Sequence, residues 1–444
     1  KSHIENIILK GNTKTKDYVI LRELPIESGD IFSKAKVESG LRNLFNTQYF
    51  SAIVPDFVSG SEQNLVDMVI TLEEASTTSV EFGVTFSGVV NPNDSPVSGF
   101  VKWSDTNVGG TGKTVSTSFV ASNTEQSISL GYGDSWFLGL PISVSASLDF
   151  SHADSLCLQK VYLPSGVDET NYYMNYDKWT FGGGVSVGKR WTPNFAILTL
   201  SGGLNTSFVR NSYDADLYTP VSSVIAENHG KFGIANTLWT SFSLDDRDIY
   251  YDPSKGWFAS QRFSLVGLIP EKESEYYLRS DTKGELYFTL FQRQISETWT
   301  LKFVLAGYSG LSFVFPTFSD KIEDDGYLYI DGMFNGRGWG NLETYQNRGN
   351  AMWSSYLELR MPIATGVFAL DFFGDAVAVK ENPKDLFTNL TLDDFYFSFG
   401  PGMRFSLPQF PLRLLLANTF KFEDNNFEWD KKWQFVLSFN LSNR

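Results

Sequence analysis

Residues 142–150, ISVSASLDF, alternate between apolar and polar side chains, and this stretch decides the fold class. A period of two is that of a β-strand, whose successive side chains point to opposite faces. The same alternation occurs at 80–86, VEFGVTF, and at 432–441, KWQFVLSFNL. Strands of a two-layer sandwich also alternate, but they usually span about 5–6 residues. Because the segments here approach or exceed the roughly 9–11 residues of a tilted membrane strand, the pattern favours a transmembrane β-barrel.

Segments with this pattern recur from residue 78 to the end of the chain, and they number about sixteen. Their approximate cores are 78–87, 97–103, 113–122, 126–133, 142–152, 179–190, 195–209, 231–244, 257–268, 280–293, 298–310, 350–361, 366–379, 394–406, 411–421 and 432–441. The long, polar connections between them are 153–178, 210–230, 269–279 and 311–349. Short turns on one rim and long loops on the other are typical of bacterial outer-membrane barrels. The sequence therefore predicts an all-β transmembrane barrel of about sixteen antiparallel strands over 76–444.

The composition agrees with this prediction and excludes several classes of protein. Aromatic residues make up 16% of the 444 residues and charged residues only 20%, with 37 Gly, 38 Phe and 20 Tyr. The net charge of −15 argues against a nucleic-acid partner, because neutralising phosphates requires clustered Lys and Arg. No run of about 18 apolar residues predicts a transmembrane helix. The chain begins at Lys1 without the pattern of a signal peptide, so we expect a processed or shortened form.

Residues suited to catalysis or metal binding are few. Cys157 is the single cysteine, which excludes an intrachain disulfide and a cysteine zinc cluster. Cys157 and His152 are predicted to lie in a long loop, and the order Ser, His, Asp at 151–154 is more typical of a solvated loop than of a triad. The triplet 182–184, GGG, lies inside a predicted strand and indicates strand bending. We expect no enzyme activity, no cofactor and no metal site. The acids at 323–325 lack the spacing of a calcium loop, so we expect a solvated face.

The first 75 residues have a different pattern, which predicts a small α+β domain over 1–75. The predicted elements are a strand at 3–11, a helix at 15–24, a helix with Ser33 as its N-cap, and strands at 51–58 and 65–72. The second helix has an apolar face made by Val37, Leu41, Leu44 and Phe45. The order β-α-α-β-β allows two amphipathic helices to be buried on a three-stranded sheet.

Several short motifs, in their order along the chain, resemble a known family. GNT at 11–13, SGDIF at 28–32 and QYF at 48–50 resemble a POTRA domain. The later segments resemble the barrel of the BamA/TamA superfamily of outer-membrane assembly factors, and they are LDDRD at 244–248, DPSKG at 252–256, NGRGW at 335–339, YLELRMP at 356–362 and FFGD at 372–375. The loop tip departs from the family pattern, because Gly336 replaces an aliphatic residue and Trp339 replaces Phe or Tyr. Only one POTRA domain is present.

The strand faces on which the charged residues lie predict where the loop tip lies. Glu358 and Asp375 each share a strand face with other polar residues, opposite an apolar face, and lipid cannot solvate charge, so both should point into the barrel. From the residues alone, ordinary solvated charges in the lumen remain an alternative. The resemblance implies that loop 311–349 folds inward and that Arg337 contacts both acids. The residues expected at this contact are Gly336, Arg337, Gly338, Trp339, Glu358, Phe373 and Asp375.

The first and last strands should meet to close the barrel, and we call their junction the lateral seam. The last strand is short, so the seam should leave free backbone groups that an incoming strand can pair with. The expected seam residues are Val80, Phe82, Val84, Thr85, Phe435, Leu437, Ser438 and Phe439. The resemblance implies that nascent barrel proteins are templated at this seam and released sideways into the membrane.

The resemblance therefore implies the central component of the outer-membrane protein assembly machinery in a Gram-negative cell, with the N-terminal domain in the periplasm. The implied partners are unfolded outer-membrane proteins, periplasmic chaperones, accessory lipoproteins and outer-membrane lipid. A polypeptide translocase of the same superfamily, of the two-partner-secretion or TamA-like kind, is the alternative. A diffusion porin needs no module such as 4–72, and a barrel enzyme needs a nucleophile and base at one rim, so both are disfavoured.

Overall fold

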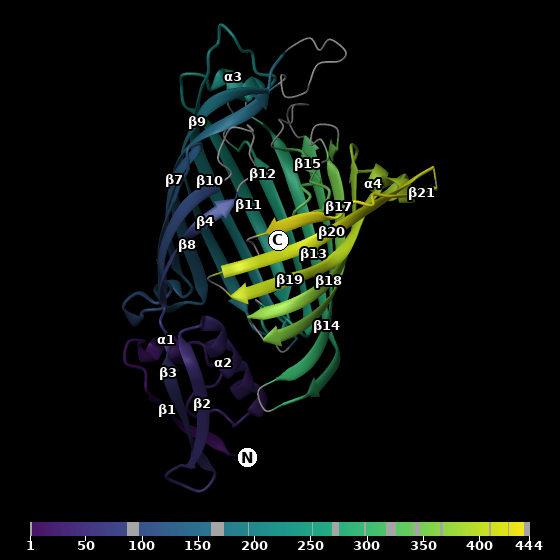
Figure 1. The fold of residues 1–444 in the computed structure, drawn as a ribbon. Helices are drawn as coiled ribbons and strands as arrows, with labels where there is room; N and C mark the ends of the chain where they lie inside the picture. The colour runs from purple at the N-terminus through teal and green to yellow at the C-terminus, as the bar shows by residue number, and fades with distance from the viewer. Residues whose placement is uncertain are drawn as a thin grey trace. The chain divides into compact units, whose positions relative to one another are not determined.

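The computed structural model describes residues 2–86, 97–160, 173–193, 195–250, 252–268, 275–296, 299–316, 326–340, 342, 347–364, 367–407, 410–424 and 426–438. By their internal contacts the residues divide into two compact units, each described separately below. The first unit is Lys1–Ala153 with Phe181–Ser186, and the second is Asp154–Thr180 with Val187–Arg444. Figure 1 shows the elements of both units.

The N-terminal part of the first unit is the predicted β-α-α-β-β module. Its elements are β1 (His3–Lys10), α1 (Asp17–Leu21), α2 (Lys34–Thr47), β2 (Phe50–Ser59) and β3 (Leu65–Glu74). The sheet has the order β1-β3-β2, with β1 parallel and β2 antiparallel to β3. Ser33 caps α2 as predicted, because its side chain accepts a hydrogen bond from the Lys36 amide.

The core of this module joins both helices to the sheet. Ile20 of α1 and Leu44 of α2 are at most 1% exposed and pack with Ile4, Met68 and Ile70 of the sheet. Phe45 was predicted on the same apolar face but is 49% exposed, so that assignment is wrong. One residue is about 100° of helix rotation, which turns Phe45 away from the face that Leu44 occupies.

The rest of the first unit is a meander of antiparallel strands. They are β4 (Thr78–Phe86), β5 (Val97–Asp105), β6 (Lys113–Ala121), β7 (Glu125–Asp134) and β8 (Ile142–Leu158), of which β8 continues into the second unit. Each pairs with the next along the chain. Two short 3-10 helices, η1 (Val108–Gly110) and η2 (Phe137–Gly139), connect β5 to β6 and β7 to β8.

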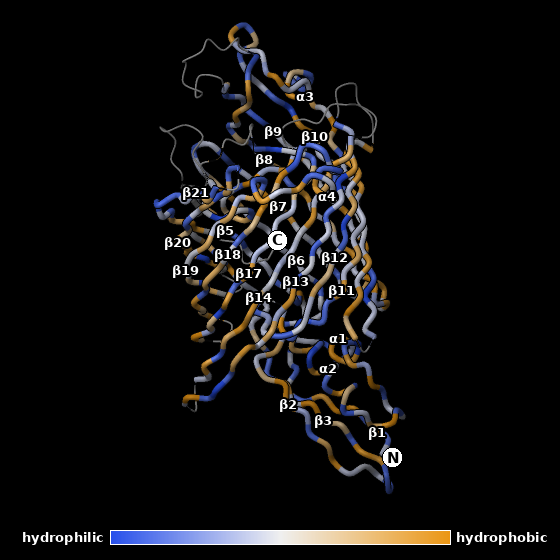
Figure 2. The backbone as a smooth tube through the Cα atoms, turned by 90° about the vertical axis from the view of Figure 1, so that its right-hand side faces the viewer, coloured by the Kyte–Doolittle hydropathy of each residue, from blue (hydrophilic) through white to orange (hydrophobic). Residues whose placement is uncertain are grey.

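The second unit continues the antiparallel pattern. Its strands are β9 (Tyr173–Trp191), β10 (Ile197–Ser212), β11 (Gly233–Asp245), β12 (Gly256–Val266), β13 (Tyr277–Gln294), β14 (Thr300–Pro316), β17 (Ala351–Ala364), β18 (Phe368–Lys380), β19 (Phe395–Leu407), β20 (Phe410–Glu423), β21 (Asn426–Trp429) and β22 (Gln434–Ser438). The short elements are α3 (Ser223–Glu227), β15 (Leu328–Tyr329), β16 (Arg348–Gly349), α4 (Asp385–Thr388) and η5 (Leu392–Asp394). Apolar and polar residues alternate along the long strands, as Figure 2 shows.

These elements confirm the predicted fold class, a long antiparallel sheet of the barrel kind that follows an α+β module. Each of the sixteen predicted segments corresponds to one strand. An additional short strand, β21, forms a hairpin with the end of β20. Among the described residues, the helices are all too short and too polar to cross a bilayer.

Three boundaries predicted from the sequence are wrong. β8 extends to Leu158, β9 already begins at Tyr173, and β14 continues to Pro316. His152 and Cys157 therefore lie in β8 and not in a loop, and Cys157 is buried beside Met174 and Tyr176. In the added ends of β8 and β9, polar residues such as Asp154 and Asp177 interrupt the alternation that marks a strand in the sequence. The added end of β14, LSFVFP at 311–316, is apolar and was assigned to a loop because of the polar residues that follow it.

Candidate functional site

The loop tip between β15 and β16 is held together by one acidic residue and two glycines. The Oδ1 of Asp331 accepts hydrogen bonds from the amides of Met333, Phe334 and Asn335 at 2.8, 2.6 and 2.8 Å. Gly336 and Gly338 adopt positive φ angles of 62° and 93°. A Cβ on Gly338 would lie 2.7 Å from the Cβ of Ala417 on β20, so glycine allows the tip to approach the sheet closely.

Arg337 of this tip is bound to two acids on neighbouring strands. Its Nε and Nη2 donate to the two carboxylate oxygens of Asp375 on β18, at 2.8 and 2.5 Å, and its Nη1 donates to Glu358 on β17 at 2.6 Å. The side chains of all three residues are at most 4% exposed. The planar guanidinium group can bind one carboxylate through two bonds and still reach a second, which a lysine could not do.

Aromatic rings complete the seat of Arg337. The guanidinium carbon lies 4.1 Å from the ring centroid of Phe373 and 5.2 Å from that of Tyr356. Trp339 donates its indole N–H to the carbonyl oxygen of Phe397 at 3.0 Å. The structure therefore brings together the seven residues expected at the loop-tip contact.

A wider network of buried charges surrounds this seat. The second oxygen of Glu358 accepts two bonds from Arg360, at 2.9 and 2.7 Å, and Arg413 lies 3.6 Å from the first oxygen. Arg404 links Asp252, in the turn before β12, to Asp371 on β18 at 3.3 and 3.5 Å. Since a buried charge without a partner is costly, these groups form an interdependent set.

Several members of this network were not expected from the sequence. The alternation of the sequence puts Arg360 on the same strand face as Glu358 and Asp371 on the same face as Asp375, but nothing in the sequence paired them with the tip. Neither Arg404 nor Arg413 was expected in this network. Arg413 interrupts a run that is otherwise apolar, PLRLLLA at 411–417, so its strand has no clear polar face. Asp252 lies in a motif that carried the resemblance, although a role in the interior was not foreseen.

The seam residues lie on strands of different units. β4 pairs with β5 from Thr78 to Phe86, and the part of β22 that the structure describes pairs with β20 over five residue pairs. Val80, Phe82 and Phe435 are 62%, 79% and 65% exposed, and Leu437 is partly exposed. The side chains of Val84, Thr85 and Ser438 and the whole of Phe439 lie outside the described residues. The acids at 323–325 are also outside them.

Polar contacts in the first unit join the N-terminal module to the turns of the following strands. The Asn107 side chain, which is fully buried, donates to Thr15 at 2.9 Å, and the Lys16 amide donates to the Gly110 carbonyl. The Trp136 indole N–H donates to Glu23 at 2.8 Å. These residues lie in turns, where the sequence has no periodicity that could predict a contact.

Glu74, at the end of β3, organises the segment that makes these contacts. It accepts hydrogen bonds from the Thr13 hydroxyl and from the amides of Thr13, Lys14 and Thr15, at 2.6–3.1 Å. Partial burial raises the pKa of the Glu74 carboxyl, but these hydrogen bonds outweigh it and lower the pKa from 4.5 to about 2.

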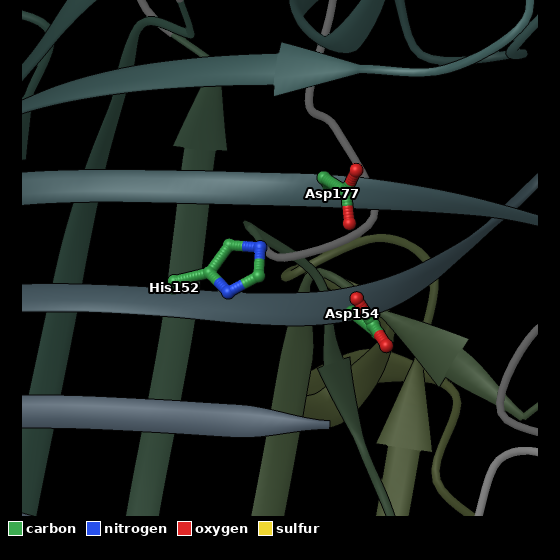
Figure 3. A group of neighbouring side chains, drawn as sticks. All are labelled: His152, Asp154 and Asp177. Atoms are coloured by element: carbon green, nitrogen blue, oxygen red, sulfur yellow. The ribbon is translucent and has the colours of Figure 1, made fainter. Parts of the chain in front are cut away.

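An exposed polar group lies where β8 meets β9. The carboxylates of Asp154 on β8 and Asp177 on β9 lie near each other, and His152 precedes Asp154 by two residues on the same strand (Figure 3). His152 forms a hydrogen bond with Gln126 at 2.9 Å. Exposed carboxylates are often neighbours without a bound ion, so we assign no metal to this group.

Comparison with known proteins adds to this geometry. The family model described as the Omp85 superfamily domain matches residues 107–441, which is most of the chain. The protein belongs to the Omp85 superfamily. A POTRA model, described as a surface antigen variable number repeat, matches residues 2–75. The resemblance to BamA-type proteins is therefore confirmed, and membership indicates the outer membrane as the location of this Omp85 protein.

Two curated relatives support the same family. The chain is 38% identical, over 483 aligned residues, to the "Putative outer membrane protein assembly factor" of Treponema pallidum (strain Nichols). The match covers all of this Omp85 chain but only 58% of the relative. A second match, 34% identical, covers 20% of the chain and 11% of "Outer membrane protein assembly factor BamA" of Nitratidesulfovibrio vulgaris.

Solved structures share the fold. BamA from Haemophilus ducreyi lacking POTRA domains 1–3 aligns with a TM-score of 0.57 at 18% identity, covering 98% of this chain and 84% of that one. CdiB from Acinetobacter baumannii aligns with a TM-score of 0.61 at 11% identity, covering 98% and 73%. At these identities the likeness concerns the fold alone.

Proposed function

We propose that this Omp85 protein folds β-barrel proteins and inserts them into the outer membrane. The observation that carries the proposal is the 38% identity over the whole chain to a relative named as a putative outer membrane protein assembly factor. In this proposal the N-terminal module lies in the periplasm and receives unfolded clients together with chaperones and accessory lipoproteins. The free energy comes from the folding and burial of the client, and no covalent chemistry is involved.

Clients are proposed to enter at the lateral seam between β4 and β22. A strand with an unpaired edge offers backbone N–H and C=O groups to an incoming strand. β22 is proposed for this role because it is the last described strand of the chain, and five pairs join its described residues to β20. The seated tip would keep the neighbouring strands β17–β20 rigid while the seam exchanges partners.

The test is to lock the seam with a disulfide. Cysteines replace Thr85 and Ser438, with neighbouring register pairs made in parallel, because a bridge needs Cα atoms within about 7 Å. Cys157→Ser is introduced first in every variant to prevent mispairing. In a strain depleted of its own assembly factor, the oxidised variant should fail to support assembly of other barrels, and a reductant should restore it.

Each single-cysteine variant under the same oxidation is the control. Normal assembly by a fully cross-linked protein would rule out release through the seam. Loss of export of one secreted polypeptide, with barrel assembly intact, would instead favour the translocase alternative.

A further inference from the structure

The inward face of the second unit carries a basic patch on β11, β12 and β13, separate from the contacts that Arg337 makes. The pairing register places Ser241 opposite Arg262, Ser260 opposite Lys283 and Ser264 opposite Arg279. The alternate positions, such as Phe242 and Phe263, are exposed apolar residues of the outer face. The strands β11, β12 and β13 therefore present their cations and hydroxyls to the barrel interior together.

This patch lines a cavity of about 440 Å³, which is within the usual size range of small-molecule sites. The described lining comprises Ser241, Ser260, Arg262, Arg279, Asp281, Lys283, Tyr308, Gly310, Ser312, Phe334, Asn335, Met352 and Ser354. Three of these side chains are cationic and one is acidic, so the described lining is positively charged within a chain of net charge −15.

The contacts of the two arginines do not cancel this charge. Asp281 accepts from the Nε of Arg279 at 3.0 Å and from the Ser312 hydroxyl at 2.6 Å. Arg262 lies over the Trp239 ring, 4.2 Å from its centroid, and its Nε reaches the Ser264 hydroxyl at 3.4 Å. Among the described lining residues, one carboxylate therefore stands beside two guanidinium groups.

The loop tip forms another wall of the cavity. Phe334 and Asn335 line it, and they precede Gly336 and Arg337 directly in the chain. A group bound in the cavity would contact the tip while Arg337 is seated between Glu358 and Asp375. Binding would then stabilise the seated tip, because a ligand favours the state that it contacts.

We propose that this cavity binds a phosphate group. The guanidinium forks of Arg262 and Arg279, together with several hydroxyls, are the donors that a tetrahedral oxyanion requires. A free phosphate ion or a phosphate on a larger molecule, such as a lipid headgroup, offers the same chemistry. The site goes beyond the proposed assembly function and does not depend on it.

The test measures binding to the purified 444-residue chain in non-ionic detergent micelles. Inorganic phosphate is titrated by isothermal calorimetry, with glycerol 3-phosphate and acetate titrated in parallel. We expect saturable binding at one site for both phosphates, and binding of acetate at least about 10-fold weaker because it accepts fewer hydrogen bonds. Tighter binding of the ester would assign an organic phosphate such as a headgroup, and tighter binding of the ion would assign free phosphate.

Variants locate the site. Arg262→Gln and Arg279→Gln, singly and combined, should weaken phosphate binding, and the double variant by about 10-fold or more. Arg293→Gln is the matched control, since it removes the same charge from an exposed position of β13. Heat-modifiable mobility in gels checks that each variant is folded. Absence of saturable binding to the parent chain, equal affinity for acetate, or undiminished binding by the folded single variants would each overturn the proposal.

Discussion

Arg337 has contacts that differ between its two acids, and this difference directs the first prediction. Asp375 receives two side-chain bonds and the Arg337 amide, whereas Glu358 is shared with Arg360. Arg337→Glu should place a third acid beside them and expel the tip. Loss of one partner from a buried pair costs about 3–5 kcal/mol, so the temperature at which the barrel loses its heat-modifiable mobility should fall clearly.

The control is a reciprocal exchange, Arg337→Asp with Asp375→Arg. It should recover part of the lost stability if the contact is direct, whereas the same exchange with Glu358 should recover less, because Arg360 and Arg413 also need that acid. Unchanged stability and normal growth with Arg337→Glu would contradict an inward seat for the tip.

Gly338 gives the second prediction at this scale. Gly338→Ala places a methyl group 2.7 Å from the Cβ of Ala417 and forces alanine to a φ of 93°. We expect a loss of about 1–3 kcal/mol from strain and crowding. Adding Ala417→Gly should restore only the part of the stability that is lost to crowding. Full recovery in urea unfolding of the double variant would mean that backbone strain is negligible, and no loss in the single variant would contradict the close approach.

The alternation of apolar and polar residues shows which residues could be assigned to the barrel interior from the sequence alone. Glu358 and Asp375 could be assigned to the interior because each lies in a strand with one clear apolar face. Arg413 could not, because its strand is apolar on both faces, with Leu415 and Ala417 buried inside and Leu416 exposed. The inserted tip covers the inner face there, and a strand covered on both sides loses its period of two.

At the scale of the secondary-structure elements, Glu74 at the end of β3 leads to a prediction about stability in acid. The pKa of Glu74 is lowered to about 2, so its stabilising effect is complete above the ordinary value of 4.5. As the pH falls from 4.5 toward 2, the folded state loses this contribution. Glu74→Gln should therefore lower stability near neutral pH and reduce the acid dependence in that window.

The measurement is thermal unfolding of the whole chain, followed by the helical signal at 222 nm, to which α2, the longest described helix, contributes. Glu62→Gln, an exposed position of the same module, is the control. Identical pH profiles for Glu74→Gln and the parent would show that the hydrogen bonds from Thr13, Lys14 and Thr15 do not persist in solution.

Element boundaries were predictable only where burial shaped the sequence. The module 1–75 was predictable because helix and strand periods alternate over short distances. Strand ends were not, since polar residues interrupt the alternation at the ends of β8 and β9, and the apolar end of β14 packs Val314 against the loop segment that contains Leu328 and Ile330. The contacts of Asn107 and Trp136 were also beyond prediction, because they join turns that lie about 90 or more residues from their partners.

At the scale of the whole molecule, the module and the strands have separate apolar cores. The core of the module draws only on residues between Ile4 and Leu72. Deletion of 2–75 should therefore leave a chain that still forms a heat-modifiable barrel, while assembly of clients in a depletion strain should stop. A deleted chain that supports normal assembly would contradict a role for the module in receiving clients, and one that never becomes heat-modifiable would show that the strands need the module to fold.

The unequal pairing of the strands also has a mechanical consequence. The backbone pairing between β13 and β14 spans seventeen residue pairs, whereas five pairs join the described residues of β22 to β20. Under tension applied at Ser438, the last described residue, we expect these five pairs to separate at a lower force than the pairs between β13 and β14. A pull from a folding neighbour would then act first on β22, and the strands that hold Arg337 would stay paired.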